Sequence, residues 1–206
     1  GYNPMNINDY QNSFDAMTDF ENKLSKYTGA PYVIATDCCT HAIELCLIYL
    51  KPTDPITLPY RTYLSVPMLM HKLELNYNIV QYEWRGRYRL APTPVWDSAR
   101  MLDQNMYLPE QYMCLSFGRT KPLEIGRGGA ILTDNEEAYV WLKQASYDGR
   151  NLSISPWQDQ VEFQLGYHYM MRPEECIEGL NKFDTIDNNY THTHEYPDIR
   201  NIKIGR

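Results

Sequence analysis

The sequence predicts a three-layer α/β protein whose central sheet is mixed and mostly parallel. Short β-branched or apolar runs alternate with longer helix-like runs along most of the 206 residues. This alternation is typical of strands that are each followed by a helix, with helices on both faces of the sheet. Hydrophobic residues make up 43% of the chain and charged residues 22%, which is ordinary for one globular domain with its own core.

The first half of the chain is predicted to begin with an amphipathic helix. Apolar residues recur at helical spacing between Phe14 and Tyr27, so a helix is expected over residues 10–28, ended by Gly29. The elements predicted after it are, in order, a strand at 31–36, a helix at 41–50, a strand at 55–60, a helix at 63–73 and a strand at 78–83.

The second half is predicted to continue the pattern. Its expected elements are strands at 92–99, 111–118 and 128–134, a helix at 135–146, and a helix that starts at Pro173. Asn135 is a suitable N-terminal cap, and Glu174 and Glu175 suit the first turn of the last helix because the helix dipole favours acidic groups there. From Asp184 the chain is polar and weakly patterned, with a possible last strand at 201–204.

Composition narrows the classes of function. The net charge of −7 and the lack of a Lys/Arg block disfavour nucleic acid as a partner. No apolar run is long enough to span a bilayer, and the polar N-terminus does not resemble a signal peptide. The five cysteines lack metal-type spacing, so we expect reduced thiols in a cytoplasmic protein. His192 and His194 lack a third spaced ligand, so no metal is expected.

Three separate features could form one site. The turn after strand 31–36 leads into a helix whose free N–H groups suit a phosphate, with the Thr40 hydroxyl beside them. Asp97 ends an apolar strand, where a carboxylate needs a partner. Lys121 lies in the loop between the strands at 111–118 and 128–134. Each also has an ordinary structural interpretation: Thr40 and Asp97 as helix caps, Lys121 as an exposed loop lysine.

Taken together, these features match the needs of one cofactor. Pyridoxal 5′-phosphate (PLP) requires a phosphate-binding turn, a carboxylate for its ring nitrogen, and a lysine that forms a Schiff base with its aldehyde. A partly desolvated lysine is suited to that role because its pKa is lowered. Neither the turn, the carboxylate nor the lysine is specific alone, but their order along an α/β chain favours PLP.

The sequence resembles the DegT/DnrJ/StrS family of PLP-dependent sugar aminotransferases, which have the aspartate aminotransferase-like fold (fold type I). The resemblance covers about residues 20–187. Its most specific part is "SFGRTKPLEIGRGGAILTD", which is similar to the family's lysine loop and glycine turn; "VWDSAR" and "LGYHYMMRPEECIEGL" are similar to two further family segments. The implied fold is the PLP-transferase large-domain type.

The resemblance also implies roles for individual residues. Lys121 would hold PLP as a Schiff base and move a proton as general base and acid, and Asp97 would keep the ring nitrogen protonated. Tyr63 would stack on the ring. The backbone around Cys39 and Thr40 would bind the phosphate.

Three further residues complete the implied site. Ser116 would add its hydroxyl to the phosphate site, and Arg100 stands where the family has a glutamine facing the phenolic oxygen of the cofactor. His168 falls where the family has an asparagine that reaches the phosphate of the neighbouring subunit, so a homodimer with shared active sites is implied. The expected reaction moves an amino group from an amino acid donor, usually glutamate, to a nucleotide-linked keto-sugar.

Several positions depart from the family pattern. Cys39 replaces a glycine, Arg127 an acidic residue of the glycine turn and Met170 an arginine. We expect residues 1–206 to form a single PLP-binding large domain, without the family's small C-terminal domain and with residues 184–206 as a polar tail, which would leave the site open to water. A sugar dehydratase is disfavoured because those relatives replace the lysine with histidine. A non-catalytic homologue that binds PLP or a nucleotide sugar remains the alternative.

Overall fold

The computed structural model describes residues 3–187, 190 and 195–205. His192 and His194 lie outside the described residues. The α-helices are α1 (Phe14–Thr28), α2 (Cys39–Leu50), α3 (Ser65–Lys72), α4 (Glu136–Ala145) and α5 (Pro173–Lys182). The strands are β1 (Tyr32–Thr36), β2 (Ile56–Pro59), β3 (Tyr77–Val80), β4 (Tyr88–Arg89), β5 (Val95–Asp97), β6 (Tyr112–Ser116) and β7 (Gly129–Thr133).

The element order agrees with the sequence prediction, and most boundaries shift by only a few residues. The sequence did not indicate β4, which is two residues long. The possible strand at 201–204 is wrong: a short 3₁₀ helix (Ile199–Asn201) is present and the following residues pair with no strand. Further 3₁₀ helices are Ile7–Asp9, Trp157–Asp159 and Phe183–Thr185. No helix among the described residues is long and apolar enough to cross a membrane.

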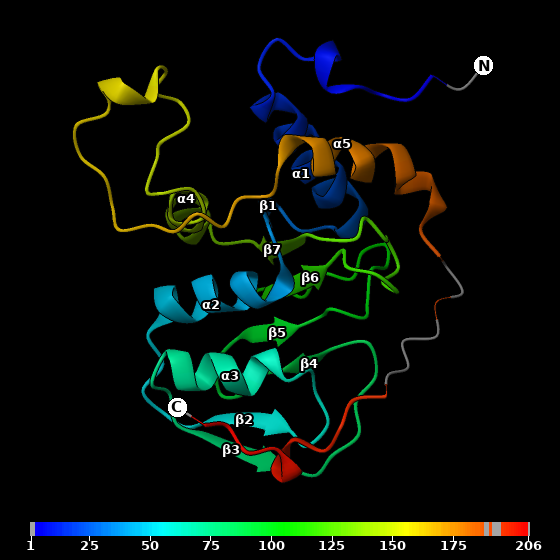
Figure 1. Ribbon diagram of the computed structural model, residues 1–206, viewed down its shortest axis with the longest axis vertical. Helices are drawn as coiled ribbons and strands as arrows, with labels where there is room; N and C mark the ends of the chain where they lie inside the picture. Colours follow the sequence, from blue (N-terminus) through cyan, green and yellow to red (C-terminus); the bar gives the residue numbers. More distant parts are fainter. Residues whose placement is uncertain (1–2, 188–189, 191–194, 206) are drawn as a thin grey trace.

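Five strands form the main sheet in the order β1-β7-β6-β5-β4, and β2 and β3 form a separate parallel pair beyond β4 (Figure 1). The α/β class and the mixed sheet are confirmed, but the expected mostly parallel pairing is not what the main sheet has. Only β5 and β6 pair in parallel, whereas the other three pairings are antiparallel. A short turn without a helix joins β4 to β5, which suits antiparallel neighbours, whereas the parallel pair β5 and β6 is joined by the longer segment 98–111.

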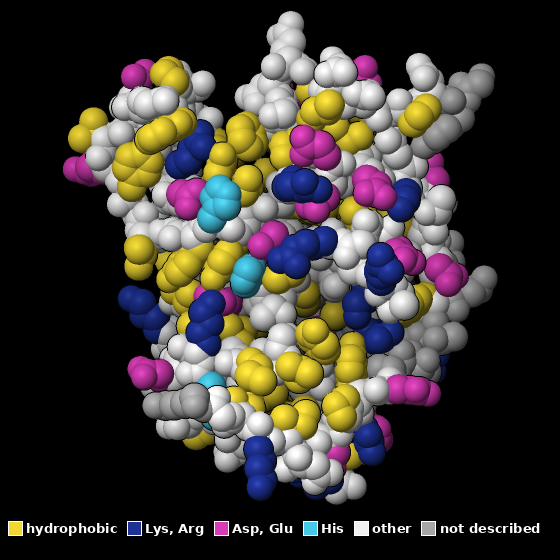
Figure 2. All heavy atoms as spheres, in the orientation of Figure 1, with side chains coloured by type: hydrophobic (Ala, Val, Ile, Leu, Met, Phe, Trp, Pro, Cys, Tyr) yellow, Lys and Arg dark blue, Asp and Glu magenta, His cyan; other side chains and the backbone are white. Residues whose placement is uncertain are grey.

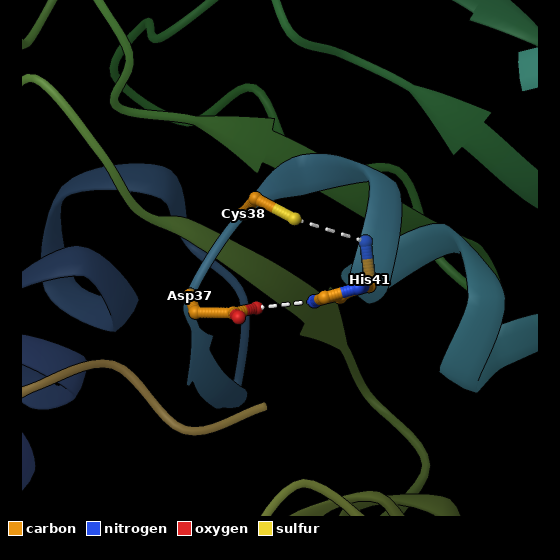
Figure 3. A group of neighbouring side chains, drawn as sticks. All are labelled: Asp37, Cys38 and His41. Atoms are coloured by element: carbon orange, nitrogen blue, oxygen red, sulfur yellow. Dashed lines mark hydrogen bonds and ion pairs between the residues drawn. The ribbon is translucent and has the colours of Figure 1, made fainter. Parts of the chain in front are cut away.

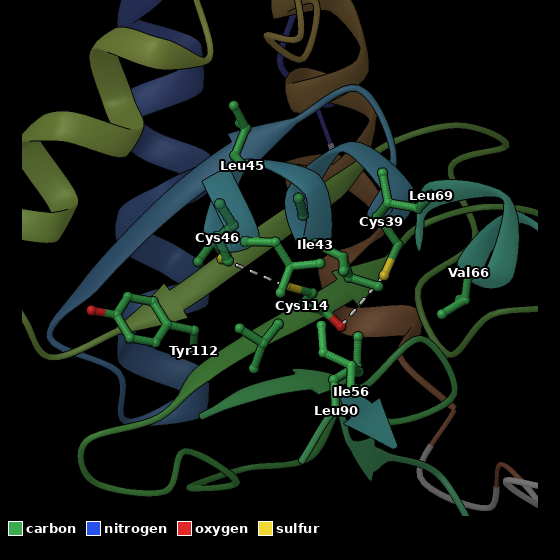
Figure 4. Close-up of a cluster of buried hydrophobic side chains, with 14 of the residues drawn as sticks. Cys39, Ile43, Leu45, Cys46, Ile56, Val66, Leu69, Leu90, Tyr112 and Cys114 are labelled. Atoms are coloured by element: carbon green, nitrogen blue, oxygen red, sulfur yellow. Dashed lines mark hydrogen bonds between the residues drawn. The ribbon is translucent and has the colours of Figure 1, made fainter. Parts of the chain in front are cut away.

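Helices cover both faces of the sheet, so the expected three layers are present. Side chains of each strand alternate between the two faces: Ile34 and Ile131 pack in a core under α2, α3 and α4, while Val33 and Leu132 pack in a second core under α1 and α5. Figure 4 shows the first core, in which the Cys46 and Cys114 thiols lie 4.0 Å apart.

One segment projects from this body. Residues 150–172, between α4 and α5, contain only one short 3₁₀ helix and extend to the upper left of Figure 1. Val161 is 91% exposed and Leu165 is 80% exposed on this segment. Elsewhere on the face shown in Figure 2, basic and acidic side chains lie next to one another over its middle and upper parts.

Candidate active site

A cavity of about 300 Å³ opens where β5 and β6 end and α2 begins. This is the edge at which ligands bind in α/β sheets, because the strand ends and helix N-termini leave polar groups there. The cavity brings together seven of the eight residues predicted for the site: Cys39, Thr40, Tyr63, Asp97, Arg100, Ser116 and Lys121. The eighth, His168, does not line it.

Asp97 lies on the inner wall of the cavity at the end of β5, and its side chain is held by two hydrogen bonds. One carboxylate oxygen accepts from the Ala99 N–H at 3.0 Å and the other from the Tyr88 hydroxyl at 3.2 Å. Tyr88 is itself paired with the Thr62 hydroxyl at 2.6 Å. Burial raises the pKa of Asp97, although these bonds and the nearby Lys121 act to lower it. A protonated ring nitrogen would supply the partner that this buried carboxylate needs.

Lys121 is positioned by the loop between β6 and β7. Thr120 just before it adopts a left-handed conformation with φ of 66°, and the Lys121 N–H donates to the Gly118 carbonyl at 3.4 Å. The side chain is half-buried rather than free in solvent. Burial, and then the positive charge of Arg100, lower the pKa of the Lys121 amine. The ordinary interpretation of Lys121 as an exposed loop residue is therefore wrong.

The glycines after Lys121 allow β7 to pass close to the start of α2. A Cβ at Gly129 would meet the Cys38 carbonyl carbon at 2.5 Å, so only glycine fits there. Gly128 has a φ of 131°, which also favours glycine. The glycine cluster thus packs one strand of the sheet against the turn that begins α2.

The first turn of α2 supplies N–H groups and hydroxyls to the cavity. The Thr40 hydroxyl is 2.7 Å from the Ser65 hydroxyl, and both residues line the cavity. The Cys39 thiol turns inward, 3.6 Å from the Cys114 carbonyl oxygen, as Figure 4 shows, and 3.9 Å from the Asp97 carboxylate. Burial raises the pKa of the Cys39 thiol well above its usual value, so it is neutral at physiological pH.

Beside this turn lie three side chains whose potential metal-binding atoms are within 4.8 Å of one another: Asp37, Cys38 and His41 (Figure 3). Their contacts are those of a capped helix start. The Cys38 thiol accepts from the His41 N–H at 3.4 Å, and the Asp37 carboxylate bonds the His41 ring at 2.6 Å. Arg127 adds a guanidinium 3.5 Å from Asp37, which disfavours a second cation there.

His168 lies away from the cavity at the end of the projecting segment. Its ring bonds the Asp148 carboxylate at 2.8 Å, and its side chain is 70% exposed. Within one chain, therefore, His168 does not complete the site that contains Lys121.

Four lining or supporting residues were not singled out from the sequence. Thr62 precedes the helix predicted at 63–73, and nothing in the sequence indicates its hydroxyl contact with Tyr88. Tyr88, Trp84 and Tyr196 carry no sequence signal for a site, because tyrosine and tryptophan are usual core and surface residues. Trp84 and Tyr196 line the cavity, and Tyr88 holds Asp97 from behind.

Solved structures with the same fold are sugar aminotransferases and related proteins. The sugar aminotransferase CalS13 from Micromonospora echinospora is 14% identical, with a TM-score of 0.66 over 83% of this chain and 60% of that one. NtdA from Bacillus subtilis with its cofactor PMP bound is 21% identical, with a TM-score of 0.62 over 83% and 48%. DesI in the presence of its TDP-sugar product is 18% identical, with a TM-score of 0.64 over 84% and 53%.

These likenesses establish the fold, and this chain spans roughly half to three fifths of the length of those structures. No curated protein matches the chain. A family model, in contrast, matches residues 5–80 and 106–199, which is most of the sequence and includes Lys121. PLP is the cofactor of that family. The chain belongs to the DegT/DnrJ/EryC1/StrS aminotransferase family.

Proposed function

We propose that this protein is a PLP-dependent aminotransferase that moves an amino group from an amino acid donor, which we take to be glutamate, to a nucleotide-linked keto-sugar. Family membership supports the aminotransferase reaction, and the structure of the similar DesI in the presence of its TDP-sugar product supports the substrate class. The observation that carries the proposal is that Asp97 and Lys121, from different parts of the chain, line one cavity at the N-terminus of α2.

The groups present fit PLP. The α2 N-terminus, with the Thr40 and Ser116 hydroxyls, suits the phosphate. Asp97 is a buried acceptor that would face the ring nitrogen, and Lys121 would hold the cofactor through its amine. When bound, PLP would act as an electron sink for the substrate carbon next to nitrogen. Tyr63, which is 54% exposed and lines the cavity, would pack on the ring.

The electrostatics around Lys121 suit proton transfer. Burial and Arg100 lower the pKa of the amine, so a larger fraction is neutral near pH 7 than for an ordinary lysine. A neutral amine can attack an aldehyde and can accept a proton from a substrate carbon. Asp97, which accepts hydrogen bonds from Ala99 and Tyr88, would hold the proton on the ring nitrogen.

We further propose a homodimer with shared active sites. Val161 and Leu165 are exposed apolar side chains on the projecting segment, which is typical of a surface that another chain covers. His168 at the end of that segment serves the phosphate site of the partner. Light scattering should give twice the chain mass. The double substitution Val161→Glu and Leu165→Glu should give monomers, and an unmodified protein that stays monomeric at high concentration would contradict the proposal.

Two further proposals concern the chain as a whole. Residues 1–206 form one PLP-binding domain, supported by the packing of Ile199 in the core beneath α2 and α3. The protein is cytoplasmic, supported by its five free cysteines, because thiols stay reduced in that compartment.

The test of the function is an amino-transfer assay with glutamate as donor and nucleotide-linked keto-sugars as acceptors. Formation of 2-oxoglutarate that depends on the keto-sugar supports the proposal, and Lys121→Ala is the control because it lacks the amine. A protein that binds PLP at Lys121 but transfers no amino group would contradict the aminotransferase assignment and favour the non-catalytic alternative.

A further inference from the structure

Residues 195–202, named here the C-terminal arm, are anchored beside the cavity. Ile199 is only 4% exposed, and its N–H donates to the Tyr60 carbonyl just after β2 at 2.8 Å. Arg61 donates to the Tyr196 carbonyl at 3.0 Å. The arm therefore has a defined place against the β2–β3 pair, although the sequence predicted only a polar tail in this region.

The arm inserts Tyr196 into the cavity wall. Its ring stacks near Trp84, with centroids 6.1 Å apart and an interplanar angle of 18°, and lies 6.3 Å from the Tyr63 ring. The Arg100 guanidinium lies over the same ring at 5.2 Å, and Arg100 Nε donates to the Tyr196 hydroxyl at 3.2 Å. Arg100 is thus held by both the face and the hydroxyl of Tyr196.

Tyr190 holds Arg100 from a second direction. Its hydroxyl accepts from Arg100 Nη1 at 2.9 Å and donates to the Thr120 carbonyl at 2.8 Å. Thr120 directly precedes Lys121 in the loop between β6 and β7. The tyrosine therefore links the guanidinium to the backbone that carries the lysine.

We propose that Tyr190 and Tyr196 are positioning residues that hold the Arg100 guanidinium in the cavity, beside Lys121 and facing the anionic oxygen of the bound cofactor. The part of this role that concerns the cofactor rests on the proposed function. An arginine side chain has many rotamers, and fixing it before binding removes that entropic cost from the binding step. The two hydroxyls leave the guanidinium planar and charged, so it can still donate to an anion.

The positioning of Arg100 can be tested without cofactor, because the titratable groups near the Lys121 amine set its pKa. They are Arg100, Cys39 and Asp97, and of these only Arg100 is positive. If the hydroxyls hold Arg100 near Lys121, removing both lets the guanidinium move into solvent. The pKa of the Lys121 amine then rises, because one of the two effects that lower it is weakened.

The experiment compares the wild type with Tyr190→Phe, Tyr196→Phe and the double variant, using Tyr10→Phe as the matched control. Tyr10 donates its hydroxyl to Asp19 on α1, outside the cavity. Phenylalanine keeps each ring and its stacking. The first readout is the pH dependence of Lys121 acetylation by acetic anhydride in the cofactor-free protein, followed by peptide mapping. The second is PLP affinity.

We expect the double variant to react at Lys121 about threefold more slowly near pH 8, which corresponds to about half a pKa unit. PLP binding should weaken about fivefold, because the Arg100 side chain would then have to be fixed during binding. The control should match the wild type in both readouts.

An unchanged pH dependence of Lys121 acetylation in the double variant overturns the proposal, whatever its affinity for PLP. If the wild type takes up no PLP, the proposed function fails, but the acetylation profile still decides the positioning role. If the double variant does not fold, the two single variants decide by the same readout.

Discussion

Replacing Asp97 by asparagine or by alanine should separate its role in the cofactor site from its role in the fold. Asparagine keeps one oxygen that accepts from the Ala99 N–H, and its amide NH₂, in place of the second oxygen, can donate to the Tyr88 hydroxyl. Alanine removes both acceptors. Tyr88 keeps its bond with the Thr62 hydroxyl, so the Ala99 N–H is the donor that loses its side-chain partner.

The magnitudes follow from these contacts. Two neutral-strength hydrogen bonds contribute about 1–3 kcal/mol, and the retained Tyr88–Thr62 contact places Asp97→Ala near a loss of about 2 kcal/mol in the free energy of unfolding. Asp97→Asn should lose little. A charged hydrogen bond to the ring nitrogen contributes about 1.5–3 kcal/mol, so Asp97→Asn should weaken PLP binding about ten- to hundredfold.

The pH dependence gives a further check on the asparagine variant. Burial raises the pKa of Asp97 in the folded state, so the wild type loses stability from this group as pH rises through the carboxyl range. Asparagine does not ionise. The difference in stability, Asp97→Asn minus wild type, should therefore increase with pH above the ordinary carboxyl pKa and stay constant below it.

Urea unfolding and PLP titration measure both effects. We expect Asp97→Ala to unfold at a lower urea concentration than the wild type. We expect Asp97→Asn to unfold near the wild type, to bind PLP more weakly and to react more slowly with an amino acid donor. An asparagine variant with wild-type affinity and an unchanged half-reaction rate would remove Asp97 from the mechanism.

Two further predictions concern charged groups outside the cavity. Lys143 lies 2.6 Å from the buried carboxylate of Glu21, so Lys143→Ala should lower the free energy of unfolding by about 3 kcal/mol, because a buried charge loses its partner. Lys182→Ala, which removes an exposed ion pair with Glu178, should change the free energy of unfolding by less than about 1 kcal/mol. If the two substitutions had equal effects in urea unfolding, the difference between the buried and the exposed pair would be refuted. For His41, burial lowers the pKa, but the bonds to Asp37 and the Cys38 thiol outweigh it and raise the pKa to about 9. This interaction stabilises the fold below pH 6.5 and is lost as pH rises towards 9, so NMR should give a His41 pKa near 9, and Asp37→Asn should move it towards 6.5; an unchanged value would refute the pairing.

The elements that the sequence predicts well are those with a strong local pattern. The spacing of Phe14, Phe20 and Leu24 and the left-handed Gly29 define α1, with its first residue placed four positions later than expected. Strand directions were harder to predict, because pairing depends on which strands meet in space. The two-residue strand β4 has no pattern long enough to recognise.

The inner site was predictable because its residue types are chemically unusual for their positions. A carboxylate at the end of an apolar strand and a lysine before three glycines both needed explanation, and Asp97 and Lys121 do line one cavity. The outer wall was not predictable. Tyr190 and Tyr196 reach Arg100 through contacts about ninety residues apart in sequence, and a tyrosine in a polar segment gives no local sign of such a contact.

The role proposed for Lys121, to carry the cofactor, can be tested directly. The most direct measurement is incubation of the purified protein with PLP, reduction with borohydride, and peptide mass mapping beside Lys121→Ala. We predict a yellow protein and a pyridoxyl group on the peptide that contains Lys121, and we predict that Lys121→Ala shows neither. A reducible adduct that persists at another lysine in Lys121→Ala, or no adduct in the wild type, would contradict it.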